Sequence, residues 1–76
     1  MEKKLPIFKT GDRVKIIALP PYLKTADPMP MLRPNSAIAL GEEGIIIKQN
    51  FGGYYSIRFT QGAYLLESKY IALADN

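Results

Sequence analysis

Apolar and polar residues alternate in two clear runs along this chain of 76 residues. In RVKIIAL, residues 13–19, Val14 and Ile16 alternate with basic side chains. In YYSIRF, residues 54–59, every second side chain from the second tyrosine onward is apolar. A period of two is typical of a strand with one buried face. We therefore predict a β-strand at each of these two places.

Three further runs have the composition of strands, and glycine-containing turns separate them. They are EEGIIIKQ at residues 42–49, AYLLE at 63–67 and IAL at 71–73. The consecutive isoleucines of the first run are β-branched and suit a pleated, mostly buried position. Glycine accepts the backbone angles of the tight turns between such strands. The predicted core is Val14, Ile16, Ile45, Ile47, Tyr55, Ile57, Phe59, Leu65, Ile71 and Leu73.

These five short strands predict an all-β fold, a small five-stranded SH3-like barrel with a long proline-rich first loop. The loop covers residues 20–40, and residues 1–8 form a frayed basic leader. The apolar fraction of 47% is ordinary for a globular chain. Because a chain of this length is near the lower limit for one core, we expect residues 1–76 to form a single domain.

The stretch LPPYLKTADPMPMLRP, residues 19–34, holds five of the six prolines and two of the three methionines. Proline has no amide hydrogen for a ladder, so we expect the stretch to form neither a strand nor a helix. Methionine adapts to irregular partner surfaces, and an exposed apolar patch usually marks a partner. The alternative is that the apolar side chains fold back and cap the barrel. The predicted partner-binding residues are Tyr22, Leu23, Lys24, Asp27, Met29, Met31, Leu32 and Arg33.

The sequence is poor in groups that perform catalysis. It has no cysteine and no histidine, which removes the usual zinc ligands, the thiol nucleophile and the general base of neutral pH. Glu42 and Glu43 are adjacent, and neighbours in a strand point to opposite faces. We therefore predict a protein that is not an enzyme, with no catalytic residue, metal site, cofactor or small-molecule substrate.

Charge and hydropathy give weaker signals. Ten basic against seven acidic side chains give a net charge of +3. The basic cluster near the start could steer an acidic partner or only solvate the leader and the first strand. No run of apolar residues is long enough to cross a membrane, so we expect a soluble, cytoplasmic protein without membrane insertion. The cluster consists of Lys3, Lys4, Lys9, Arg13 and Lys15.

Nucleic-acid binding is a further possibility for a small barrel. Tyr54 and Arg58 share a predicted strand face, and Phe51 lies in a hairpin turn. An exposed aromatic ring beside a cation can stack on a base. The sequence has no basic stripe along the strands, so nucleic acid is not the favoured partner.

Three strings together resemble the SipA family of small cyanobacterial regulatory proteins. They are ALPPYLKTADPMPMLRP at residues 18–34, LGEEG at 40–44 and GGYYSIRFTQGAYLLESKYI at 52–71. The resemblance runs from about Phe8 to Leu73. It implies an SH3-like barrel that binds the ATP-binding domain of a sensor histidine kinase of the NblS type. It further implies that the protein enhances autophosphorylation of that kinase in stress signalling.

Two other functions remain open. The barrel pattern is also similar to that of the small SH3-like protein of photosystem I, which implies a docking subunit of a photosynthetic electron-transfer complex. In that case the basic residues within 9–15 would face an acidic carrier. The second is a small nucleic-acid-binding barrel.

Overall fold

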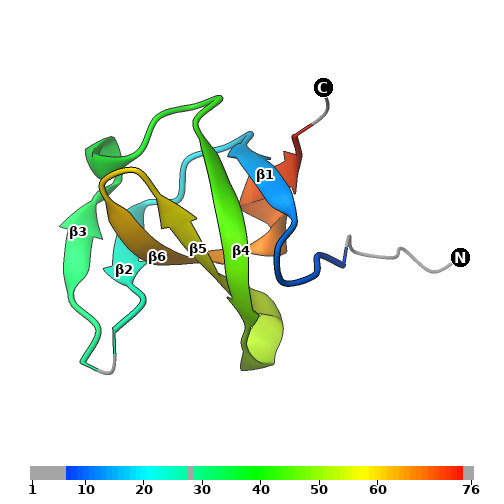
Figure 1. The fold of residues 1–76 in the computed structure, drawn as a ribbon. Coiled ribbons are helices and arrows are strands. Elements are labelled where there is room, and N and C mark those ends of the chain that lie inside the picture. The colour runs from blue at the N-terminus through cyan, green and yellow to red at the C-terminus, as the bar shows by residue number, and fades with distance from the viewer. Residues whose placement is uncertain (1–6, 28, 75–76) are drawn as a thin grey trace, which may run out of the picture.

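The computed structural model describes residues 7–27 and 29–74, which form an all-β fold (Figure 1). Strands β1, β4, β5, β6 and β7 lie where alternation predicts strands, so the predicted all-β class is confirmed. The strands are β1 (Arg13–Ile16), β2 (Tyr22–Thr25), β3 (Leu32–Pro34), β4 (Glu43–Gln49), β5 (Tyr54–Phe59), β6 (Gly62–Glu67) and β7 (Ile71–Leu73). Three short 3-10 turns connect them: η1 (Asn35–Ala37), η2 (Phe51–Gly53) and η3 (Ser68–Tyr70).

All seven strands belong to one antiparallel sheet with the order β3-β2-β6-β5-β4-β1-β7. The predicted number of five strands is wrong, because the segment between β1 and β4 contributes β2 and β3. The pairings form an open sheet whose edge strands are β3 and β7. Leu23 of β2 and Ile71 of β7 nevertheless belong to one hydrophobic cluster, so the sheet curves around a common core (Figure 1).

The core combines predicted and unpredicted residues. Of the ten predicted core residues, Ile45, Ile47 and Leu73 are exposed and Leu65 is only half-buried, so these four assignments are wrong. The other six are buried. The core consists of Phe8, Val14, Ile16, Leu23, Ile38, Ile46, Tyr55, Ile57, Phe59, Tyr64, Leu66 and Ile71.

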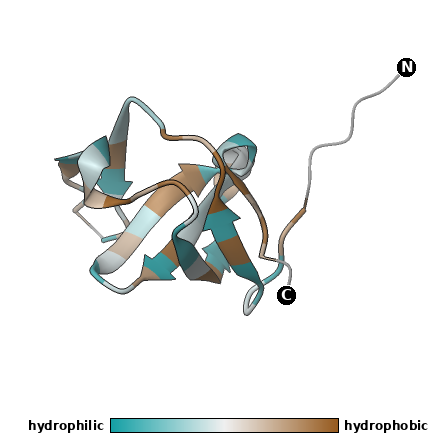
Figure 2. Ribbon diagram, turned by 90° about the horizontal axis from the view of Figure 1, so that it is seen from above, coloured by the Kyte–Doolittle hydropathy of each residue, from teal (hydrophilic) through white to brown (hydrophobic). Residues whose placement is uncertain are grey.

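The error in β4 has a local cause at Gly44. A Cβ atom on this residue would lie 2.8 Å from the carbonyl oxygen of Arg58 on β5, so only glycine fits there. Gly44 is buried, which makes Ile46, two residues later, the core-facing isoleucine of β4. A register shift between Ile46 and Lys48 marks a β-bulge that ends the regular pairing with β5. The alternation of hydrophobic and hydrophilic positions along the strands is visible in Figure 2.

The start of the described chain is packed against the sheet. The leader predicted for residues 1–8 falls on residues 1–6, outside the described part, and on Ile7 and Phe8. Phe8 is buried, and its ring meets that of Tyr55 edge-on with centroids 5.4 Å apart. Its backbone N–H donates to the Tyr55 hydroxyl at 3.2 Å. The prediction of a frayed leader is therefore wrong for Phe8.

Candidate functional site

The proline-rich segment forms a β-hairpin, which corrects the prediction of a loop without strands over residues 20–40. Strand β2 pairs with β3 on one side and with β6 on the other. Prolines are tolerated because they flank the strands: Pro20 and Pro21 precede β2, and Pro34 is the last residue of edge strand β3. A proline at a sheet edge leaves no ladder hydrogen bond unmade.

Hydrogen bonds hold the hairpin in place. The Thr25 N–H donates to the Met31 carbonyl at 2.9 Å, and the Met31 N–H donates to the Thr25 hydroxyl at 2.8 Å. The Asn35 side-chain amide donates to the Pro20 carbonyl at 2.9 Å, which ties the end of the hairpin to its beginning. The hairpin is thus a fixed extension of the sheet, and its side chains have defined directions.

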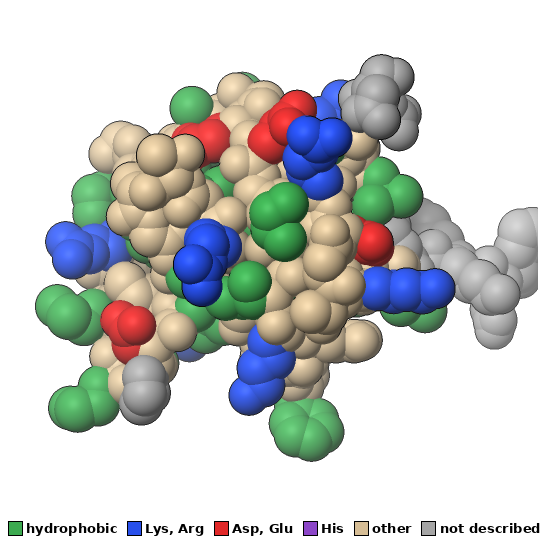
Figure 3. Space-filling model, in the orientation of Figure 1, with side chains coloured by type: hydrophobic (Ala, Val, Ile, Leu, Met, Phe, Trp, Pro, Cys, Tyr) green, Lys and Arg blue, Asp and Glu red, His purple; other side chains and the backbone are tan. Residues whose placement is uncertain are grey.

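Large apolar side chains project from this hairpin into solvent (Figure 3). Met29 is 83% exposed, and Tyr22, Met31 and Leu32 are also exposed. Leu23 is 1% exposed and belongs to the core, so the alternative that these side chains fold back holds for Leu23 alone. The structure therefore gathers seven of the eight predicted partner-binding residues on the surface of one element.

The pairing register divides these residues between two faces. Lys24 lies opposite Leu32, and Leu23 lies opposite Arg33. Side chains opposite one another in an antiparallel pair share a face. Lys24 and Leu32, with Tyr22, therefore lie on the face turned away from the core. Arg33 shares the inner face with Leu23, but it is exposed because β3 extends past the core at the sheet edge.

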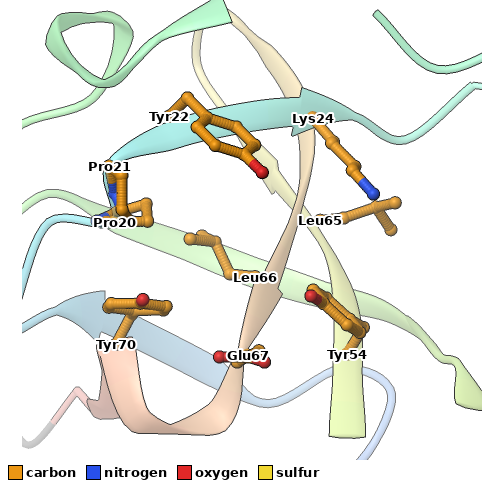
Figure 4. Close-up of a pocket in the computed structure, with 9 residues that line it drawn as sticks. All are labelled: Pro20, Pro21, Tyr22, Lys24, Tyr54, Leu65, Leu66, Glu67 and Tyr70. Carbon is orange, nitrogen blue, oxygen red and sulfur yellow. The ribbon is translucent and has the colours of Figure 1, made fainter. Parts of the chain in front are cut away.

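A groove lies beside the hairpin, with a volume of about 240 Å³ (Figure 4). Tyr22 forms one wall, while Tyr54 and Tyr70 form the other. The prediction includes Tyr22 and Lys24 but misses the remaining lining, because the tyrosines come from segments far apart in the sequence. The outward position of Tyr54 in the alternation of β5 was the one available signal. The lining consists of Pro20, Pro21, Tyr22, Lys24, Tyr54, Leu65, Leu66, Glu67 and Tyr70.

The charges around the groove are unevenly paired. The Lys69 ammonium lies 3.5 Å from the Glu67 carboxylate and 5.3 Å from the centroid of the Tyr70 ring. Tyr70 and then Glu67 raise the pKa of Lys69, which keeps the ammonium charged at neutral pH. The ion pairs of the described residues, Arg13–Glu43 and Glu67–Lys69, leave Lys24 without a carboxylate partner. The free charge of the groove is therefore positive.

The residues considered for nucleic-acid stacking lie apart. Tyr54 lines the groove, whereas Arg58 is four residues further along β5, about 13 Å away at the rise of a strand. Arg58 lies opposite Ile45 of β4, and Phe51 is in η2. The structure does not bring the three side chains into one stacking platform.

Metal-ligating clusters and membrane-spanning helices are both absent from residues 7–27 and 29–74. Within these ranges no group of three or more acidic, histidine or cysteine side chains is placed to hold a metal ion. The same part of the chain contains no helix long and apolar enough to span a membrane.

The fold and the site define a small all-β domain with an exposed apolar hairpin and an aromatic groove. The family model for Protein CHLORORESPIRATORY REDUCTION 42-like matches residues 10–71, and the chain belongs to this CRR42-like family. The chain is 35% identical over 64 residues to Protein CHLORORESPIRATORY REDUCTION 42, chloroplastic, of Arabidopsis thaliana. That match covers 83% of this chain and 53% of the relative, so the chain spans about half the relative's length. No solved structure matches the chain.

This family membership corrects several predictions. The resemblance to the SipA family is wrong, and so are the NblS-type histidine kinase partner, the enhanced autophosphorylation and the cyanobacterial two-component signalling inferred from it. The predicted cytoplasmic location is also wrong, because the relative is a chloroplast protein. The strings that carried the resemblance are turn glycines, alternating strands and prolines flanking an edge hairpin. Such features are required by the fold and do not specify a partner.

Proposed function

We propose that this protein is a non-enzymatic docking protein of a photosynthetic electron-transfer complex, and that it contacts its partner through the β2–β3 hairpin. The relative's name concerns chlororespiratory reduction and the chloroplast, and membership of the same family supports carrying this setting to the present chain. The absence of histidine and cysteine supports a binding role over a catalytic one.

The observation that carries the proposal is the exposure of Met29, Met31 and Leu32 on an ordered hairpin. Large apolar side chains that remain in solvent while their backbone is held in place form a preorganised contact surface. Methionine side chains adapt to the shape of a partner, which suits a docking surface. Lys24, Asp27 and Arg33 provide a charged rim of both signs around this apolar centre.

The basic residues near the start of the chain are a less favourable docking surface. Arg13 lies 3.9 Å from Glu43, and Lys15 lies opposite the same Glu43 in the pairing of β1 with β4. An acidic residue between two cations reduces the positive field that a carrier would meet. The apolar hairpin therefore supports the proposal better than the basic cluster does.

Affinity capture from an extract of photosynthetic membranes tests the proposal. We expect the tagged protein to retain components of an electron-transfer complex, identified by mass spectrometry. The combined Met29→Ala, Met31→Ala and Leu32→Ala variant should lose most of this capture. Charge reversal at Lys9, Arg13 and Lys15 should leave it largely intact. Loss with charge reversal alone, or retention of nucleic acid in place of the complex, would contradict the proposal.

For the fold, we propose that the curved sheet is an SH3-like barrel whose first loop carries the added β2–β3 hairpin. Support comes from the five remaining strands, β6-β5-β4-β1-β7, which are consecutive in the sheet and share one core.

A further inference from the structure

The groove beside the hairpin has features of a peptide-binding site that the docking proposal does not use. Its floor is Leu66, which belongs to the core, and its walls carry three tyrosine rings from β2, β5 and η3 (Figure 4). A tyrosine provides a rigid apolar face and a polar hydroxyl. The groove therefore combines flat aromatic walls with hydrogen-bonding groups along an open trough.

The sheet around the groove excludes recognition by strand addition. Strand β2 already pairs with β3 and β6, and β5 already pairs with β4 and β6. A backbone ladder cannot be extended where both edges of a strand are taken. A ligand in this groove must therefore be recognised through side chains, in a conformation that needs no ladder.

The size and rigidity of the groove favour an extended ligand. About 240 Å³ is below the usual range of small-molecule pockets and too narrow for a helix, whose diameter with side chains is about 10–12 Å. A polyproline II segment has no internal hydrogen bonds and repeats every three residues, advancing about 9 Å per turn. Its proline rings pack on aromatic walls, which is how aromatic-lined grooves recognise proline-rich segments.

Charge selects among proline-rich ligands. Glu67 is paired with Lys69, while Lys24 at the Leu65 end of the groove has no carboxylate partner among the described residues (Figure 4). An acidic residue of the ligand placed against Lys24 would complement this free charge. We propose that the groove binds an extended, proline-rich segment of a partner protein that carries an acidic residue beside its prolines. This inference goes beyond the docking function and does not depend on the hairpin tip.

A titration followed by nuclear magnetic resonance tests the groove directly. The probe is a synthetic peptide of about seven residues, about 22 Å long in the polyproline II form, with two prolines three positions apart and a terminal glutamate. A matched peptide has alanine in place of the prolines. We expect saturable amide shifts centred on residues 20–24, 54, 65–67 and 70, with a Kd on the order of 100 µM because little surface is buried.

Variants separate the groove from other exposed aromatic residues. Tyr54→Ala should weaken binding about tenfold or more, as expected for an aromatic anchor. Tyr22→Ala provides the same test at a more exposed position. Phe51→Ala is the control, because this residue is 99% exposed, lies three positions before Tyr54 and is not part of the groove. Lys24→Glu should weaken the acidic peptide but not one with a neutral end.

Several outcomes would overturn the inference. These are equal affinity for the alanine peptide, no saturable binding, or shifts concentrated on edge strand β3 or β7. Shifts that grow with protein concentration without peptide would instead indicate that a second copy occupies the groove. The combined Met29→Ala, Met31→Ala and Leu32→Ala variant should bind the peptide normally. Failure of the docking proposal and failure of the groove are therefore distinguishable.

Discussion

Strand β4 and the β2–β3 hairpin both bring apolar residues together, but they use them differently. In β4, Ile46 is fully buried between neighbouring strands, while Ile45 is 39% exposed on the outer face. In the hairpin, Leu23 reaches the core, and the apolar residues of the tip reach nothing within the described chain. Strands in the centre of the sheet therefore stabilise the fold, whereas the hairpin contributes one anchor and presents the rest.

The largest expected effect is at the centre of the sheet. Ile46→Ala removes a fully buried side chain and should lower the free energy of unfolding by about 2–5 kcal/mol. The matched change Ile45→Ala, one residue earlier, should cost less than about 1 kcal/mol because that side chain is partly solvated. Urea unfolding of both variants checks the difference. A larger loss at Ile45 would mean that β4 has the opposite face inward.

The hairpin anchor should show the next largest effect. Leu23→Ala removes the hairpin's buried leucine and should lower the free energy of unfolding by about 2–4 kcal/mol. Leu32→Ala makes the same chemical change in the partner strand and should cost less than about 0.5 kcal/mol. Thermal unfolding of the two variants gives the comparison. Equal midpoints would show that the hairpin does not pack on the core.

Overpacking at Gly44 should have a smaller but clear effect. The added methyl group of Gly44→Ala would meet the Arg58 carbonyl oxygen and the Ile57 side chain at 2.8 Å, so β4 and β5 must separate. We expect a loss of about 1–3 kcal/mol in the free energy of unfolding. Gln49→Ala, at an exposed position of the same strand, is the control for urea unfolding. Indistinguishable stabilities would show that the two strands have room to spare.

Local alternation predicts much of the fold. The bounds of β5 and β7 follow from the sequence to the residue, because strand period and turn glycines are properties of neighbouring positions. The inward faces of β4 and β6 do not follow. A shift of one residue exchanges the two faces of a strand, and in β4 the shift depends on how closely Gly44 approaches β5.

The candidate site is less predictable from the sequence than the fold. The density of prolines hides β2, whose regular part is four residues long and depends on pairing with β6. The residues of the hairpin could still be chosen, because large apolar side chains beside prolines stand out in the sequence. The groove could not, since the packing of three separate segments brings Tyr22, Tyr54 and Tyr70 together.

The sharpest test of the hairpin tip compares stability and binding in one variant. Met29, Met31 and Leu32 are exposed, so their combined replacement by alanine should change the free energy of unfolding by less than about 1 kcal/mol. The same protein should lose at least about tenfold in capture of the electron-transfer complex, because the apolar centre of the contact is gone. Unchanged stability with lost capture is the predicted result. A large loss of stability, or full capture with unchanged stability, would contradict the assignment of the hairpin tip as the docking surface.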